Sequence, residues 1–436
     1  MTATLLHLRR SVLGTAGQVT LLTGLLSGTQ GLAAILTAGW LGAHDRGIVV
    51  LAATISSLML LVAGLGLNSV ARMLLADADS RIGIRLFQSR ALQLVAIEAL
   101  PLALVGGAIF GGVTGLREPV TLGVFGLHCV AMTLGAILRE TLHGIGRHRV
   151  AVATDLAAAA VLLGGSALLH AQGRLSVLAV LILMLAGALT QCVVGLAVGR
   201  RGDAGHDRAG SLPLRRLLGL GVAGMGLGVG QWVVWRGDRL ILGLVAGPEP
   251  VGVYGFISTL ADIPWVIPAA VAAVVTRRVG QGLPPDELAR TRRRVTILAV
   301  SLSALIAGVA IPLIPIFPGG SYPAGIPALL ILVPATAALA IAQIDLAACV
   351  GYGELTAGAR ATMVAAGCMV ILGPPLAWAW GPTGCAAASL VTYTIMAIRA
   401  RAALRARLAL TTSTAPAGTE APHPAEDQRQ DSRDTH

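Results

Sequence analysis

Long apolar segments alternate with short polar joins along almost the whole chain. Most of these segments are about 20 residues or longer, the length that a helix needs to cross the hydrocarbon core of a bilayer. A helix satisfies all of its own backbone hydrogen bonds there, which an open strand cannot do. The pattern predicts twelve spans, near residues 13–41, 47–70, 91–114, 120–138, 150–170, 176–198, 217–245, 251–275, 295–314, 325–350, 362–380 and 385–398.

The composition supports the same class. Hydrophobic residues make up 55% of the 436 positions, charged residues make up 12%, and the mean hydropathy is +0.79. A soluble domain carries about 25% charged residues. We therefore predict an all-α integral membrane protein.

A repeat divides the chain into halves. Glycines 42 and 47, Thr54 and Arg72 recur 205 positions later as Gly247, Gly252, Thr259 and Arg277. Each copy is an apolar segment, a Gly-to-Gly turn (GAHDRG, GPEPVG), a second apolar segment and a basic end. Such repeats are common in transporters.

We therefore predict two six-helix bundles, at 1–199 and 217–410. The polar, Gly-rich and basic stretch 200–216 is predicted to be a cytoplasmic linker. Residues 411–436 have the composition of a disordered tail.

The arginines predict the orientation. All of them except Arg46, Arg117, Arg174, Arg236 and Arg239 fall on the side of the N-terminus. The positive-inside rule then places both termini in the cytoplasm of a multi-pass protein of the cell membrane.

Several function classes are excluded or disfavoured. All 32 basic residues are Arg, so the chain has no Lys for a Schiff base or for a phosphate-binding GxxxxGK[ST] loop. The basic residues lie between apolar segments, which disfavours nucleic-acid binding. The five cysteines lie in apolar windows and lack the spacing of metal ligands. The joins on the outer side of the membrane are too short to hold catalytic groups. We expect no enzyme activity, cofactor or metal site.

Three stretches resemble one family. GWLGAHDRGIVVLAATISSLMLLVAGLGLNSVAR is similar to the first hairpin of the polysaccharide and lipid-linked oligosaccharide flippases, which belong to the multidrug/oligosaccharidyl-lipid/polysaccharide exporter superfamily. RGDRLILGLVAGPEPVGVYGF resembles the join between their seventh and eighth helices, and GPTGCAAASLVTY resembles the start of their last helices. The likeness covers about residues 13–404.

The resemblance implies a V-shaped pair of bundles around a cavity that opens alternately to either side. The first span carries no Arg, whereas lipid II flippases of this superfamily place arginines there, which argues against a peptidoglycan precursor as substrate. It also has no Asp, which many drug-extruding members keep there for ion coupling.

The seventh span carries the candidate substrate-binding residues. Trp232, Trp235, Arg236 and Arg239 recur at helical spacing along one face. Indole rings stack on sugars, and guanidinium groups pair with phosphate oxygens. The alternative is that these side chains anchor the helix at the outer membrane interface.

Intramembrane carboxyl groups are candidates for ion coupling, since an ionisable group inside a span is costly and usually functional. The candidates are Asp238, Asp262, Asp155, Glu98 and Asp345. Asp262, in mid-span before Pro264 and Pro268, is the first choice. Asp155 could instead pair with Arg149 near the cytoplasmic edge, and His128 is interpreted as a satisfied core histidine.

The function that these features favour is a flippase or exporter that moves a lipid-linked oligosaccharide or polysaccharide precursor across the cytoplasmic membrane by alternating access. The alternative is a multidrug or cation antiporter of the same superfamily. Expected partners are the lipid-linked glycan and membrane lipids, with glycan-assembly enzymes as further candidates and no nucleic acid.

Overall fold

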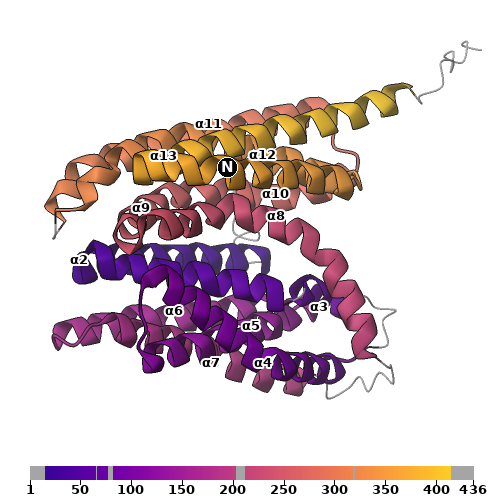
Figure 1. Cartoon of the computed structure of the whole chain (residues 1–436). Helices are drawn as coiled ribbons and strands as arrows, with labels where there is room; N and C mark the ends of the chain where they lie inside the picture. The colour runs from indigo at the N-terminus through magenta and orange to yellow at the C-terminus, as the bar shows by residue number, and fades with distance from the viewer. Residues whose placement is uncertain (1–14, 65, 77–81, 203–211, 318–319, 414–436) are drawn as a thin grey trace, which may run out of the picture.

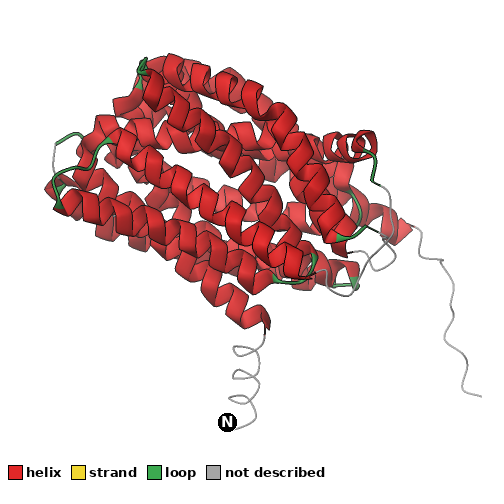
Figure 2. Cartoon of the chain, turned by 90° about the horizontal axis from the view of Figure 1, so that it is seen from below, coloured by secondary structure: helices red, strands yellow, loops and turns green. Residues whose placement is uncertain are grey.

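The computed structural model describes residues 15–64, 66–76, 82–202, 212–317 and 320–413. Within these ranges the chain is built of helices joined by short loops (Figure 2). The first half of the chain forms α2 (Thr15–Ala63), α3 (Leu67–Ala76), α4 (Ile84–Thr114), α5 (Pro119–Gly144), α6 (His148–Ala171) and α7 (Val177–Gly202). The second half forms α8 (Leu214–Ala246), α9 (Pro248–Asp262), η1 (Ile263–Trp265), α10 (Val266–Gly280), α11 (Pro285–Leu313), η2 (Ile314–Ile316), η3 (Tyr322–Gly325), α12 (Ile326–Gly351) and α13 (Leu355–Ser413).

Nine stretches of the described residues are long and apolar enough to cross a membrane. Two of them, Leu22–Ala63 in α2 and Thr356–Ala409 in α13, are 42 and 54 residues long. Each breaks at a glycine outside the helical region, Gly42 and Gly381, and so contains two of the predicted spans. The chain is a multi-pass membrane protein, and the number twelve remains a prediction.

The two Gly-to-Gly segments redirect the chain over fewer residues than the sequence predicted. At Gly42 the backbone has φ 76° and ψ 172°, and at Gly247 it has φ 81° and ψ −174°. A positive φ is accessible to glycine without a Cβ clash, so one residue redirects the chain. The helix then resumes at once, and Pro248 at the start of α9 suits a first helical turn. The two repeats therefore share the same backbone break, and GAHDRG and GPEPVG are kinks and not loops.

Several predicted joins are also helical. Arg72 lies in α3, Arg85 and Arg90 lie in α4, and the basic stretch before residue 295 belongs to α11. The ends of the predicted linker are helical as well, since α7 continues to Gly202 and α8 begins at Leu214. Charged helix ends lie outside the apolar windows that define a span, so hydropathy alone could not locate them. Residues 203–211 and the tail from 414 lie outside the described residues.

In Figure 1 the helices of the first half, α2 to α7, lie beside those of the second half, α9 to α13. Helix α8 runs from one group to the other. Its first turns pack on the first half, where Leu217 joins a buried cluster with Leu67 and Phe87. Its last turns pack against α9 and α13. The division into two bundles stays a prediction, and α8 connects them by packing as well as by sequence.

Candidate functional site

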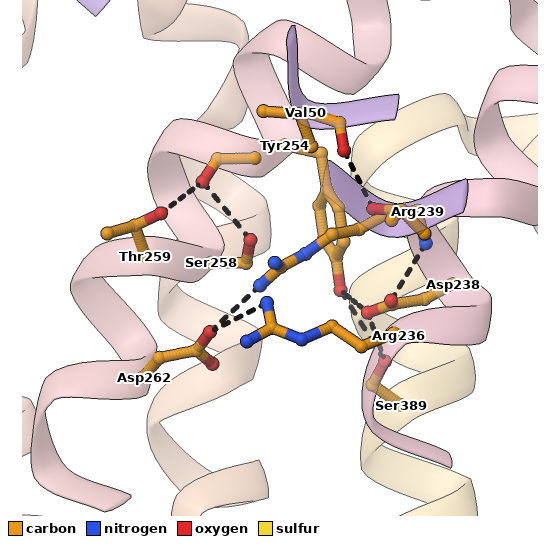
Figure 3. Close-up of polar contacts among 11 residues, drawn as sticks. Val50, Arg236, Asp238, Arg239, Tyr254, Ser258, Thr259, Asp262 and Ser389 are labelled. Atoms are coloured by element: carbon orange, nitrogen blue, oxygen red, sulfur yellow. Dashed lines mark hydrogen bonds and ion pairs between the residues drawn. The ribbon is translucent and has the colours of Figure 1, made fainter. Parts of the chain in front are cut away.

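Arg236 and Arg239 of α8 share one carboxylate. The Arg239 guanidinium donates from Nη2 to Asp262 Oδ2 at 2.8 Å, and Arg236 Nη1 lies 3.7 Å from the same oxygen (Figure 3). Asp262 is the last residue of α9, where the helix gives way to a turn containing Pro264. The group carries two positive charges and one negative charge.

Asp238 forms a separate network. It is 4% exposed and accepts three hydrogen bonds, from the Tyr254 hydroxyl at 2.6 Å, from the Arg239 backbone N–H at 2.8 Å and from Ser389 Oγ at 3.2 Å (Figure 3). These contacts join α8, α9 and α13. The Asp238 side chain is therefore held by hydroxyl and backbone donors and forms no ion pair with the Arg239 guanidinium.

The two tryptophans of the predicted stripe on α8 have different neighbours. Trp232 donates from Nε1 to Ser57 Oγ of α2 at 2.9 Å, across the two halves of the chain. The Trp235 ring lies 6.3 Å from that of Trp265, and Trp265 meets Tyr393 edge-on at 6.0 Å. The side chains of Trp232 and Trp235 are both half-buried.

A cavity of about 560 Å³ lies beside this group. Helices α2, α5, α6 and α7 form most of its wall, and α8 and α9 complete it with Arg236, Arg239, Gly255 and Thr259. Its hydrogen-bonding residues are Gln30, Thr37, Thr54, Ser56, Ser57, His128 and Gln191, and its charged residues are Arg46, Arg139, Asp155, Arg236 and Arg239. Arg236 and Arg239 thus line a cavity, whereas Trp232 and Trp235 of the same predicted stripe are not among its lining residues.

Arg46 is a cavity residue that the sequence interpretation missed. It is 9% exposed, its Nε has no hydrogen-bond partner, and it makes no ion pair with a described residue. Its nearest electrostatic neighbours include Tyr322 and Arg239. We had assigned Arg46 to an outer join, but the kink at Gly42 is so short that Arg46 lies in the next helical turn. The sequence signal that could have identified this residue is the presence of an arginine within an apolar hairpin.

At another part of the cavity wall Asp155 is neutralised. Arg139 Nη1 lies 3.1 Å from Asp155 Oδ2, and Gln191 donates to Oδ1 at 2.7 Å. Arg139 also pairs with Glu140 at 3.1 Å. The observed ion-pair partner of Asp155 is therefore Arg139 of α5, and not Arg149 as the sequence suggested, because packing of α5 on α6 brings a more distant residue closer.

The other candidate carboxyl groups are not among the residues lining this cavity. Asp345 is fully buried, 2.8 Å from Arg292 Nη1 and 3.3 Å from Arg401 Nε, and so joins α11, α12 and α13. Glu98 is half-buried on α4, and its Oε2 has no hydrogen-bond partner. The arrangement of Asp345 is that of a structural ion pair.

His128 differs from the expected satisfied histidine. It is 4% exposed, lines the cavity and lies near the backbone of Met184, but neither ring nitrogen makes a hydrogen bond of ordinary geometry. Such a group can donate to or accept from a ligand. Among the described residues no group of three or more His, Cys, Asp or Glu side chains is placed to hold a metal ion.

Solved structures with this fold are membrane transporters. No protein-family model and no curated protein sequence matches the chain. The lipid II flippase MurJ in an inward closed conformation aligns with a TM-score of 0.62 at 13% identity, over 89% of this chain and 87% of that one. An outward-facing multidrug resistance MATE transporter aligns with a TM-score of 0.58 at 13% identity, over 91% and 96%.

A third similar structure is a superfamily transporter from Pyrococcus furiosus, described as having a binding pocket of reverse polarity. It aligns with a TM-score of 0.54 at 14% identity, over 91% of this chain and 94% of that one. The chain therefore shares the all-α fold of these solved structures. Identities of 13% and 14% show the fold and leave the substrate open.

Proposed function

We propose, from the fold shared with flippases and exporters, that this protein moves a lipid-linked oligosaccharide or polysaccharide precursor across the cytoplasmic membrane by alternating access. The lipid chain would stay in the bilayer while the anionic phosphate and sugars pass through the cavity. In the proposed reaction the headgroup moves from the cytoplasmic to the outer leaflet.

The observation that supports this proposal most is the charge of the cavity wall. Arg46, Arg236 and Arg239 meet it from α2 and α8. Asp262 pairs with Arg236 and Arg239, and Arg46 has no ion-pair partner among the described residues. Arg46 and Arg239 are buried, and a buried guanidinium group without a matching carboxylate is unfavourable until an anion joins it. Arg also presents a planar fork of donors that fits phosphate oxygens.

The rest of the wall suits a glycan. Hydroxyl and amide groups from Gln30, Thr54, Ser56 and Ser57 offer both donors and acceptors, as sugar hydroxyls require. His128 adds a buried imidazole with no hydrogen bond of its own. A volume of about 560 Å³ is within the usual range for ligand sites, about 300 to 1,000 Å³.

Asp262 is our leading candidate for coupling transport to an ion. It is the carboxylate that holds both α8 arginines. If a proton or another cation neutralised it, Arg236 and Arg239 would be released toward the headgroup. Asp238, Asp155, Glu98 and Asp345 remain weaker candidates, because none of them forms an ion pair with Arg236 or Arg239.

The alternative is a multidrug or cation antiporter, which the similarity to MATE structures favours. The positive charges of Arg46 and Arg239 would repel a cationic drug. Such a drug would therefore bind only if the charge of the cavity residues changed. We therefore rank this function second.

Deletion of the protein tests the proposal. A lipid-linked glycan should then accumulate on the cytoplasmic leaflet, and Arg46→Ala, Arg236→Ala and Arg239→Ala should each restore export poorly. Arg117→Ala, at an exposed arginine away from the cavity, is the matched control and should restore it fully. Normal export together with hypersensitivity to cationic drugs would support the antiporter instead.

A further inference from the structure

A second hollow lies on the outside of the first half, between α4 and α7. Its volume is about 520 Å³, and it is lined by Arg85, Gln88, Ser89, Leu92, Gln93 and Leu196. The five α4 residues fall at positions i, i+3, i+4, i+7 and i+8, so they belong to one face of the helix. None of them lines the central cavity.

One polar contact joins the two walls of this groove. Gln88 is 3% exposed and donates from Nε2 to the Gly195 carbonyl of α7 at 3.2 Å. Arg90 Nη1 donates to Gln93 Oε1 at 2.8 Å, which fixes the amide at the groove. Arg85 and Ser89 are exposed at its mouth. The groove is therefore a built polar and basic site at the start of α4.

Farther along both helices the same faces become apolar and exposed. Leu100 and Leu104 continue the α4 face and are 69% and 63% exposed. Leu189 and Val193 precede Leu196 on one face of α7 and are 46% and 66% exposed. In a membrane protein such side chains contact acyl chains. A polar end with Arg85, next to exposed apolar side chains of α4 and α7, matches one amphiphilic molecule, with its head at Arg85 and its chains along the helices.

We propose that the α4–α7 groove binds an anionic glycerophospholipid of the surrounding leaflet, with its phosphate at Arg85 and Ser89. Basic pockets between transmembrane helices near the cytoplasmic surface are favourable sites for anionic headgroups. An arginine contributes charge, and the neighbouring hydroxyl and amide groups contribute hydrogen bonds that a zwitterionic ethanolamine headgroup uses less well. This site is separate from the central cavity and does not depend on the proposed substrate.

Native mass spectrometry of the full-length protein tests the site. Phosphatidylglycerol and phosphatidylethanolamine are titrated separately into the detergent-solubilised protein. We expect Arg85→Gln to weaken phosphatidylglycerol binding at least fivefold and to leave phosphatidylethanolamine binding unchanged, while Arg85→Lys keeps most of the binding. Arg360→Gln, an exposed arginine at the start of α13, measures the non-specific effect of one lost charge and should change binding less than twofold.

Two results would overturn the proposal. Equal loss in Arg85→Gln and Arg360→Gln would mean that the attraction is only a property of net charge. Displacement of phosphatidylglycerol from the wild-type protein, but not from Arg85→Gln, by an equimolar polyprenyl phosphate would mean that the groove receives a carrier lipid. Thermal unfolding of each variant, unchanged within about 2 °C of wild type, would show that a binding loss is not a folding defect.

Discussion

Gly47 and Gly252 meet backbone to backbone where the two halves of the chain join. A Cβ on Gly47 would collide with the Pro248 carbonyl, and one on Gly252 would collide with the Ala43 carbonyl. Residues 43 and 248, like residues 47 and 252, are 205 positions apart, so the contact is reciprocal. The sequence repeat thus corresponds to a symmetric contact between the two hairpins. Each hairpin has a glycine against which a backbone carbonyl of the other hairpin packs.

This contact should control how the halves separate. We expect Gly47→Ala and Gly252→Ala to destabilise the closed contact by about 1 to 3 kcal/mol, as overpacking does in a tight interface. Hydrogen exchange at the α2 and α9 kinks should accelerate accordingly. Gly164→Ala in α6 has open space around its Cβ and should leave that exchange unchanged. Equal protection in all three variants would show that the kinks do not form a tight contact.

Arg46 and Asp262 should respond to mutation in opposite ways. The Arg46 side chain makes no ion pair with a described residue and its Nε has no hydrogen-bond partner, so Arg46→Gln should leave the melting temperature unchanged or raise it while transport falls at least tenfold. Asp262→Asn removes the partner of the buried Arg239 and should cost about 1 to 3 kcal/mol. Thermal unfolding and transport measured on the same preparations separate the two roles. A large stability loss in Arg46→Gln would reveal a structural function for this residue.

Asp345 should be needed for stability and not for substrate binding. The Asp345→Asn change leaves Arg292 and Arg401 without their shared carboxylate. Because these arginine side chains are 21% and 32% exposed, we expect a cost of about 1 to 3 kcal/mol. Chemical denaturation in detergent measures the loss, and transport per folded molecule should be retained. The exposed pair of Arg407 and Glu354 offers a comparison, since Arg407→Gln should cost at most about 1 kcal/mol.

Tyr254 should stabilise the position of Asp238. Tyr254→Phe keeps the buried ring but removes the 2.6 Å hydrogen bond to the carboxylate, at an expected cost of about 1 to 3 kcal/mol. Ser389→Ala removes the longer bond of 3.2 Å and should cost less. Unfolding free energies of the two variants and their double mutant measure the coupling. Strict additivity would mean that the two hydroxyl groups act independently on Asp238.

The sequence predicted the helical membrane class and the repeated Gly-to-Gly segments, because each depends on local patterns. Apolar length predicts spans, but it did not show that each six-residue turn is a kink at a single glycine. The position of Arg46 was missed because a single glycine at Gly42 sets the direction of the following turn. The partner of Asp155 was wrong because it depends on how α5 packs on α6. The charged helix ends around Arg85 were assigned to a loop because hydropathy measures apolar length and not helix length.

The most direct test of the account is lipid translocation in proteoliposomes. A fluorescent polyprenyl pyrophosphate-linked glycan is placed in one leaflet, and its arrival in the other is measured by quenching from outside, beside a cationic dye in a parallel sample. We predict that the wild-type protein accelerates translocation of the glycan, that Arg46→Gln and Arg239→Gln reduce the rate at least tenfold, and that Arg117→Gln does not. Transport of the cationic dye by the wild-type protein, with no translocation of the glycan, would contradict the account.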